Sequence, residues 1–357
     1  MAREHFVRSQ TRIKVVGLGG AGCNAVTRMV REQVPGVEFI AMNTDMQHLG
    51  VTEANVRIQL GERTTRGLGA GGDYALGQKA AEESRNEIQQ ALTEADMVFI
   101  TAGMGGGTGT GSAALVSDIA RKSGALTLAV VTTPFTFEGI HRSRIAEDGI
   151  NNLKDRVDTL IVVSNDRLLD LCNQKVSLDH AFRMADEVLF RAVQAVAGVI
   201  TGPGLINLDF ADIKAVMQGA GPAWMSIGHG SGRNRAVDAA KEALSSPLPD
   251  VSVSGARGAL INISGGSDLT LFEINDAAKV IRQSLDPEAN VVLGVVIDPK
   301  IGSEVRLTLI ATGFRTISRR LTGHSEKAAQ TLRKPTTEEE LDIPSFMRQR
   351  GKMPGRS

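Results

Sequence analysis

The segment GMGGGTGTGS at residues 103–112 constrains this chain more than any other feature of its sequence. Six of its ten residues are glycine, and Thr108, Thr110 and Ser112 add hydroxyl groups. The apolar run MVFITA precedes it and SAALVSDIARKSG follows, which predicts a strand, a glycine-rich turn and a helix. Because glycine has no Cβ, backbone N–H groups can close on an anion at the positive end of that helix. The pattern predicts a phosphate-binding loop, whereas an unflanked glycine run would suit a linker.

Apolar runs recur along the first half of the chain, with helical segments between most of them. IKVVGLG begins at residue 13, and EFIAMNTD, MVFITAG, LTLAVVTTPF and TLIVVSND follow. Nearly continuous apolar strands that alternate with helices are typical of a parallel sheet covered on both faces. Residues 13–176 are therefore predicted to form an α/β domain behind a polar N-terminus at 1–12.

The second half has a different pattern. Residues 177–203 space apolar side chains at helical intervals, which predicts one long, mostly buried helix. Residues 204–314 mix predicted strands and helices and are expected to form an α+β domain. Residues 315–340 are basic and then acidic and contain few large apolar side chains, so we expect a disordered linker before the last segment, 341–357.

Composition excludes several classes of protein. Forty basic residues balance forty acidic ones, so charge favours neither nucleic acid nor anionic membrane as a partner. No apolar run approaches the roughly 18 residues that a membrane span needs. The two cysteines, Cys23 and Cys172, are far apart and form no CxxC pair, which argues against a disulfide framework or a zinc site. We expect a soluble cytoplasmic protein.

A second glycine loop, GLGGAG at 17–22, matches GxGxxG directly after the first predicted strand. Alone it suggests a nicotinamide-dependent oxidoreductase in which Asp45 would hold a ribose, but that hypothesis leaves the richer loop at 103–112 unexplained. No GxxxxGK sequence is present, so backbone amides and hydroxyls must hold the phosphates. A nucleotide-binding module that never polymerises is a further alternative.

Several motifs together resemble the FtsZ family, the bacterial relatives of tubulin. They are GLGGAGCNA, GGGTGTG, FEG, an NLDFAD after the long helix, and LDIPSFMR in the tail. The resemblance runs from about residue 12 to Phe314 and resumes in the tail. It implies a Rossmann-like GTPase domain at 13–176, a central helix at 177–203 and a C-terminal α+β domain at 204–314. It also implies GTP or GDP with Mg²⁺ as cofactors, and head-to-tail polymerisation into a division ring at mid-cell.

The resemblance assigns nucleotide contacts residue by residue. The matching positions are Gly20, Ala21, Gly22, Asn24, Asn43, Thr44, Asp45, Ala70, Gly71, Gly72, Gly103, Met104, Gly105, Gly106, Gly107, Thr108, Gly109, Glu138, Arg142, Asn165, Phe182 and Asp186. Among them, the loop at 70–72 matches the segment that senses the γ-phosphate. Glu138 and Arg142 match ribose and phosphate contacts, although their spacing also suits a surface ion pair.

Phe182 and Asp186 are one helical turn apart and lie on one face of the predicted helix. A purine can stack on Phe182 while the carboxylate accepts from N1–H and the N2 amino group of guanine. Adenine presents an acceptor at N1, so the carboxylate would favour GTP over ATP. The apolar neighbours of Phe182 would, on their own, assign it to the core.

Asn207, Asp209 and Asp212 match the family's synergy loop, which enters the nucleotide pocket of the next subunit. There the carboxylates would help to position and polarise the water that attacks the γ-phosphate. A purely structural interpretation is also open, because Asp209 suits a helix N-cap and Asp212 a first helical turn. Subunits that carry a pocket on one face and this loop on the other would associate into filaments.

The tail resembles the family's C-terminal peptide, which docks on regulators and membrane anchors of division. The matching positions are Asp342, Ile343, Pro344, Phe346, Met347 and Arg348. One departure lies outside the site: Pro222, Trp224 and Ser226 stand where the family commonly shows GxAxMG. Packing is therefore expected to differ in that segment.

Overall fold

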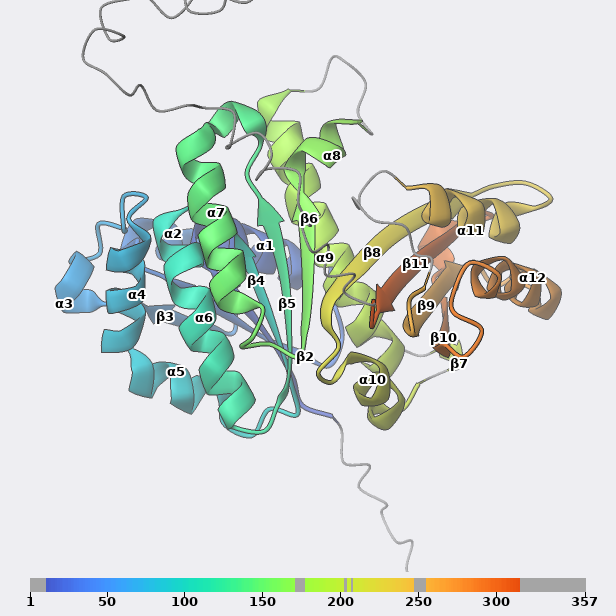
Figure 1. Cartoon of the computed structure of the whole chain (residues 1–357), viewed down its shortest axis with the longest axis horizontal. Helices are drawn as coiled ribbons and strands as arrows, with labels where there is room; N and C mark the ends of the chain where they lie inside the picture. Colours follow the sequence, from blue (N-terminus) through green and yellow to red (C-terminus); the bar gives the residue numbers. More distant parts are fainter. Residues whose placement is uncertain (1–10, 171–176, 202–203, 207, 247–254, 315–357) are drawn as a thin grey trace, which may run out of the picture. The chain divides into compact units, whose positions relative to one another are not determined.

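The structure is a computed structural model that describes residues 11–170, 177–201, 204–206, 208–246 and 255–314 (Figure 1). Some sequence predictions fall elsewhere. Cys172, Asn207, the linker at 315–340 and the peptide at 341–357 lie outside the described residues. Among the described helices, none combines the length and the apolar character needed to cross a membrane.

The first half contains the predicted parallel sheet. Its strands are β1 (Ile13–Leu18), β2 (Val37–Asn43), β3 (Val56–Gln59), β4 (Met97–Gly103), β5 (Leu126–Thr133) and β6 (Thr159–Ser164). They are ordered β3-β2-β1-β4-β5-β6, and every neighbouring pair is parallel. The carboxyl ends of these strands therefore meet at one edge, where ligands bind in open α/β sheets.

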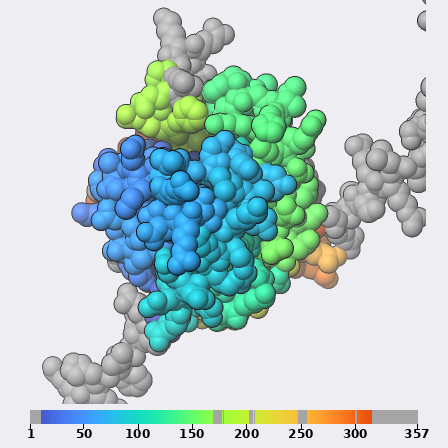
Figure 2. Space-filling view, turned by 90° about the vertical axis from the view of Figure 1, so that its left-hand side faces the viewer, coloured from blue at the N-terminus to red at the C-terminus, as the bar shows by residue number. Residues whose placement is uncertain are grey.

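Helices cover both faces of this sheet, which confirms the predicted α/β class. The face that includes Val15 packs on α1 (Gly19–Arg31) and α9 (Leu178–Thr201), and the face that includes Val16 packs on the other helices. These are α4 (Tyr74–Glu83), α5 (Arg85–Leu92), α6 (Gly107–Lys122) and α7 (Ile140–Leu153). Short elements occupy loops: α2 (Met46–Val51), α3 (Glu62–Thr65), η1 (Thr136–Glu138) and α8 (Asn165–Asp170). Figure 2 views the molecule from the left-hand side of Figure 1, and early segments of the chain, coloured blue to green, cover most of that face.

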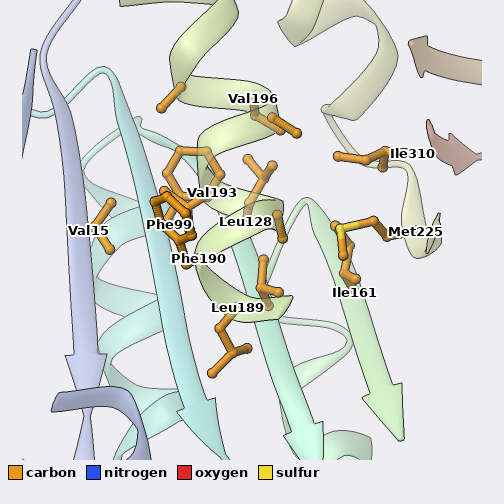
Figure 3. Packing of buried hydrophobic residues seen from close by; sticks show 14 of the residues in the cluster. Val15, Phe99, Leu128, Ile161, Leu189, Phe190, Val193, Val196, Met225 and Ile310 are labelled. Atoms are coloured by element: carbon orange, nitrogen blue, oxygen red, sulfur yellow. The ribbon is translucent and has the colours of Figure 1, made fainter. Parts of the chain in front are cut away.

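The long helix predicted at 177–203 is α9, which spans 24 residues. Its side chains Leu189, Phe190, Val193 and Val196 are buried. Figure 3 shows them among Val15, Phe99, Leu128 and Ile161 of the parallel strands and Met225 and Ile310 of the later strands. A single core cluster therefore joins both halves of the fold through α9.

The second half is α+β, as predicted. Its elements are β7 (Gly204–Ile206), α10 (Phe210–Met217), β8 (Gly221–Gly230), α11 (Arg235–Ser245), β9 (Gly258–Gly265), α12 (Leu271–Arg282), β10 (Asn290–Ile297), η2 (Pro299–Ile301) and β11 (Val305–Thr312). Helices α11 and α12 pack with β8, β9 and β11 around a separate core. Within that core the buried Arg235 guanidinium pairs with Asp268 and Glu273, each at 2.7 Å, and so ties the start of α11 to the start of α12.

Strand β8 was not predicted, and it connects the two halves. It pairs in parallel with β6 over Gly221–Ala223 and in antiparallel with β11 over Trp224–Gly230. Within the described residues, the strands thereby form one continuous sheet. The sequence of β8, GPAWMSIGHG, contains three glycines and a proline, which disfavour strands. Only the tertiary pairing of β8 with its neighbours therefore identifies it as a strand.

Glycines allow α4 and α6 to pack backbone against backbone. A Cβ built on Gly77 of α4 would lie 2.2 Å from the carbonyl oxygen of Gly107, and one on Gly111 would lie 2.3 Å from that of Tyr74. Real Cβ atoms do not approach a carbonyl oxygen this closely. The close approach places the loop before α4 directly beside the start of α6.

We predict that Gly77→Ala destabilises the protein by about 2 kcal/mol, because α4 and α6 must separate to admit the methyl group. Gly50→Ala in α2 is the matched control, since no atom of the residues that the structure describes lies within 4 Å of a Cβ at that position. Alanine there should leave the free energy of unfolding unchanged or raise it by up to about 1 kcal/mol. Urea unfolding midpoints test both variants, and equal midpoints would contradict the packing account.

Candidate nucleotide site

A cavity with a volume of about 580 Å³ opens at the carboxyl edge of the parallel sheet. Residues from the ends of β1, β2, β4 and β5, the starts of α1, α6 and α8, and the first half of α9 line it. All but three of the nucleotide contacts predicted from the sequence lie in this wall. The structure therefore brings together segments that are more than 160 positions apart in the chain.

The three exceptions, Gly22, Thr44 and Gly105, lie behind the wall. A Cβ on Gly22 would lie 2.4 Å from the carbonyl oxygen of Thr101, so this glycine serves the close packing of α1 on β4. Buried Thr44 places its hydroxyl 2.6 Å from that of Thr108. The backbone N–H of Gly105 donates to the Thr110 hydroxyl over 2.8 Å and is not available to a ligand.

Two helices begin at this cavity without side-chain caps. Neither Leu18 before α1 nor Gly106 before α6 makes a side-chain cap hydrogen bond, and neither first turn contains an acidic residue. By contrast, Asp73 and Asp209 cap α4 and α10. The first N–H groups of α1 and α6 are therefore left for an external acceptor at the positive ends of two helix dipoles. This arrangement suits a chain of phosphates.

The glycines of the wall perform two separate tasks. Within the described part of the chain, no atom lies within 4 Å of a Cβ built on Gly20, Gly71, Gly72 or Gly106, so these side chains would project into open space. A Cβ on Gly107 would instead lie 2.8 Å from that of Ala70. The first set keeps the cavity open to a ligand that contacts the backbone, and Gly107 keeps the loop at 68–72 close to α6. The cavity therefore fits a polyphosphate held by backbone amides.

The loop at 68–72 is anchored on both sides. Asp73 accepts from the N–H groups of Ala75 and Leu76 at the start of α4. Toward β2, the N–H of Gly69 donates to the carbonyl of Thr44, and Asp45 forms an isolated bridge with Leu68. A displacement of the loop at 68–72 would therefore be transmitted to the segment after β2 and to α4.

The pair on α9 that the sequence predicts to hold a purine lies in the cavity wall. Phe182 is 41% exposed and lines the cavity, so the core assignment suggested by its neighbours does not apply. Its ring contacts Phe135 edge to face with centroids 5.5 Å apart. Asp186 lines the same wall, and burial raises the pKa of its carboxyl to about 7, against an opposing effect of Arg28. The Oδ1 of Asn165 is buried there, has no hydrogen-bond partner among the described residues and can accept from a ligand donor.

Glu138 and Arg142 form the ion pair that their spacing suggests and also lie at the cavity. They form an ion pair with Nη1 to Oε2 at 2.5 Å, and both border the cavity. Oε1 of Glu138 also accepts from the N–H of Phe135, which fixes the carboxylate at the turn after β5. Arg142 is largely exposed and remains able to reach a ligand.

Sequence reasoning missed some of the lining residues. Ala185 and Leu189 follow Phe182 at helical spacing and could have been found from it. Thr132 lies near the end of β5 and Pro134 directly after it, so the apolar run that predicts β5 could have placed both at the same sheet edge. His48 lies three residues beyond Asp45 in a helix too short to be signalled by periodicity, and nothing in the sequence pointed to it.

Asp209 and Asp212 do not line the cavity. Asp209 is the N-cap of α10 and accepts from the N–H of Asp212 over 2.8 Å, and both side chains are exposed. The structural roles considered for this pair are therefore present. Among the described residues, no group of three or more His, Cys, Asp or Glu side chains is arranged to hold a metal ion.

The fold and the site define a nucleotide-binding protein of the tubulin and FtsZ class. Residues 12–173 match the GTPase domain of the Tubulin/FtsZ family, and residues 221–315 match the C-terminal domain of the FtsZ family. The chain belongs to the FtsZ family. Membership implies GTPase activity and binding of GTP and GDP, so the nicotinamide hypothesis is not retained.

Solved structures show the same relationship. An empty FtsZ dimer from M. jannaschii is 46% identical with a TM-score of 0.84, covering 87% of this chain and 90% of its own. A point mutant of M. jannaschii FtsZ, with tyrosine in place of one tryptophan, is 47% identical with a TM-score of 0.83, covering 85% and 92%. CetZ2 from Haloferax volcanii, in a GTPγS-bound protofilament, is 20% identical with a TM-score of 0.73, covering 90% and 98%, and shares the fold.

We predict that affinity for GTP falls about tenfold between pH 8 and pH 6, because only ionised Asp186 accepts from guanine and its pKa is about 7. Asp186→Asn should bind more weakly at pH 8 and lose this part of the pH dependence. Calorimetric titration of both proteins measures the effect. Titration of the nucleotide phosphates affects the wild-type protein and Asp186→Asn equally, so only the difference between their pH profiles reports on Asp186. Identical pH profiles would exclude Asp186 as the acceptor.

Proposed function

We propose that this chain is a self-assembling cytoskeletal GTPase that forms head-to-tail filaments and the cell-division ring. In this proposal GTP is hydrolysed at the interface between subunits. The observation that carries the proposal is the distance between the nucleotide cavity and the two carboxylates of the predicted synergy loop, Asp209 and Asp212.

Helix α9 separates these groups. Phe182 and Asp186 line the cavity from its first half, whereas Asp209 and Asp212 follow its far end. From Asp186 to the last residue of α9, Thr201, the helix rises about 22 Å. Figure 1 shows α8, whose first residue Asn165 lines the cavity, and α10 at opposite ends of α9. The carboxylates therefore cannot serve the cavity of their own chain without unfolding α9.

A neighbouring subunit can supply them. If α10 of one subunit meets the cavity of the next, the exposed carboxylates reach the phosphate end and can orient and polarise an attacking water. The contact joins two different surfaces, so it repeats along a filament unless it closes into a ring. Assembly would then complete the active site.

Within the cavity, this chain's own groups hold the nucleotide. Amides at the starts of α1 and α6 would bind phosphate oxygens, Phe182 and Asp186 the guanine, and Asn165 a donor of the base or ribose. Bound Mg²⁺ would neutralise charge on the β- and γ-phosphates. Asp45 and Thr108 of the cavity wall provide a carboxylate and a hydroxyl oxygen near that end.

Exposed apolar side chains support self-association at the same two places. Leu68 lies in the wall of the cavity, and Phe137 and Ile140 flank Glu138. At the other end, Ile206 of β7 pairs with Val295 near the carboxyl end of β10. Strand β9 lies parallel to β10, and its carboxyl end leads to α12. There Leu271 and Phe272 are exposed as well. Apolar patches on opposite ends of a chain favour contact between copies of it.

Several further roles remain proposals from the family resemblance. We infer a cytoplasmic protein that gathers at mid-cell. We also infer that residues 341–357, through Ile343, Phe346 and Met347, dock on division regulators and membrane anchors, with 315–340 as the tether. Replacement of these apolar residues should affect partner capture and not the nucleotide cavity.

We predict that Asp212→Ala binds GTP normally but hydrolyses it at least about tenfold more slowly. The same test at Asp209 requires asparagine instead of alanine, because asparagine preserves the N-cap of α10 while it removes the charge. Wild-type GTPase activity per molecule should rise with protein concentration. Steady-state hydrolysis and GTP titration over a dilution series measure both effects; loss of GTP binding in Asp212→Ala would contradict the shared site.

Mixing two inactive variants tests the shared site directly. Gly106→Val adds a side chain whose Cβ has no described protein atom within 4 Å, so it should fill the open cradle, abolish GTP binding and retain its α10. Asp212→Ala retains its cavity. A mixture should hydrolyse GTP because the first variant supplies carboxylates to the second. If a mixture that co-sediments remains inactive, hydrolysis does not use a neighbour's carboxylates.

We predict that Phe272→Ser raises the protein concentration needed for sedimentation with GTP by about five- to thirtyfold, as expected for loss of an interface anchor. GTP binding at low protein concentration should not change. Val51→Ser is the matched control, because Val51 on α2 is 76% exposed and Phe272 is 82% exposed. Equal sedimentation of the two variants would place Phe272 outside the interface.

A further inference from the structure

Helix α2 brings a histidine to the edge of the nucleotide cavity, and no role described above uses it. His48 lines the cavity and is half-buried. Its ring atom Nδ1 lies 3.4 Å from Nδ2 of Asn43, the last residue of β2. The ring is therefore held by a residue of the same wall.

The hydrogen bonds of Asn43 determine which nitrogen of the His48 ring carries the proton. The backbone N–H of Asp45 donates to Oδ1 of Asn43 over 3.3 Å. Since a backbone N–H can only donate, the atom that faces it must be the carboxamide oxygen. The other end of the carboxamide is then the donor NH₂, and Nδ1 of His48 must accept from it. The neutral ring consequently carries its proton on Nε2.

This leaves a donor without a partner at the cavity wall. Within the part of the chain that the structure describes, Asn43 is the partner of the His48 ring, and Nε2–H has no acceptor. The surrounding segment belongs to the phosphate side of the site. Thr44 contacts Thr108 through its hydroxyl, and Asp45 bridges to Leu68 of the loop before α4. A ligand in the cavity would present oxygen acceptors to this wall.

We propose that His48 binds the nucleotide by donating a hydrogen bond from Nε2–H to one of its oxygens, either on a phosphate or on a ribose hydroxyl. Asn43 acts as a positioning residue, because it holds Nδ1 and so selects the tautomer. The inference rests on the proposed function, since it requires a nucleotide in this cavity.

The test compares three substitutions of His48 by calorimetric titration with GTP at protein concentrations below assembly. Glutamine can place its amide nitrogen close to the position of Nε2, whereas asparagine reaches only the position of Nδ1. We expect His48→Ala and His48→Asn to weaken GTP binding about five- to thirtyfold, and His48→Gln to stay within about threefold of wild type.

Nucleotide analogues then identify the oxygen. If the acceptor is on the γ-phosphate, His48→Ala and wild type bind GDP equally. If it is a ribose hydroxyl, the 2′-deoxy or 3′-deoxy analogue that lacks it binds both proteins equally. A loss that persists with GDP and with both deoxy analogues assigns the α- or β-phosphate.

Two outcomes would overturn the proposal. One is equal GTP affinity for wild type and His48→Ala. The other is an equal loss in His48→Gln, which would indicate that the ring serves only packing; thermal unfolding of the nucleotide-free variants reports that role separately. Failure of the wild-type protein to bind GTP would refute the proposed function as well. This outcome is distinguishable from failure of the His48 proposal, because it is seen in the protein without any substitution.

Discussion

The burial of α9 between the two halves is the interaction on which the rest of the structure depends. Leu189, Phe190 and Val193 pack against the parallel strands, and the same core continues to Met225 and Ile310 of the later strands. The buried face of α9 cannot bend or slide without opening this core. The helix therefore holds the cavity-lining residues Phe182 and Asp186 at one end and the exposed carboxylates at the other, and the separation of these groups follows from its length.

Glycine determines the geometry of the phosphate end in two opposite ways. Gly77, Gly107 and Gly111 permit backbones to touch, which brings α4 and the loop before it against α6. Gly20, Gly71 and Gly106 border open space, so the ligand itself can approach the backbone. Glycine thus serves both the packing of helices and the exposure of amides. A methyl group would clash with protein atoms at the first set of positions and would occupy the space of the ligand at the second.

Local patterns predicted much of this architecture from the sequence. Five strands of the parallel sheet and α9 were evident because apolar runs and helical spacing are local signals, whereas the four-residue strand β3 was not predicted. Strand β8 was missed because its glycines and proline disfavour strands, and it is held by pairing with β6 and β11. Gly22, Thr44 and Gly105 belong to the right segments but stand behind the cavity wall, since a motif identifies a loop and not the direction of each of its groups.

The sequence by itself determined the phosphate loops, the α/β pattern, the long helix and the family, because each depends on residue types at short fixed spacings. Only the tertiary structure decided that α1 and α6 begin uncapped at one cavity, and that Asp209 and Asp212 lie beyond the far end of α9. It also decided that Asn43 holds the ring of His48. The first two properties depend on how segments distant in the chain come together, and local preferences do not encode the distance or direction between such segments. The third depends on the side-chain orientations of two residues five positions apart, which their spacing alone does not set.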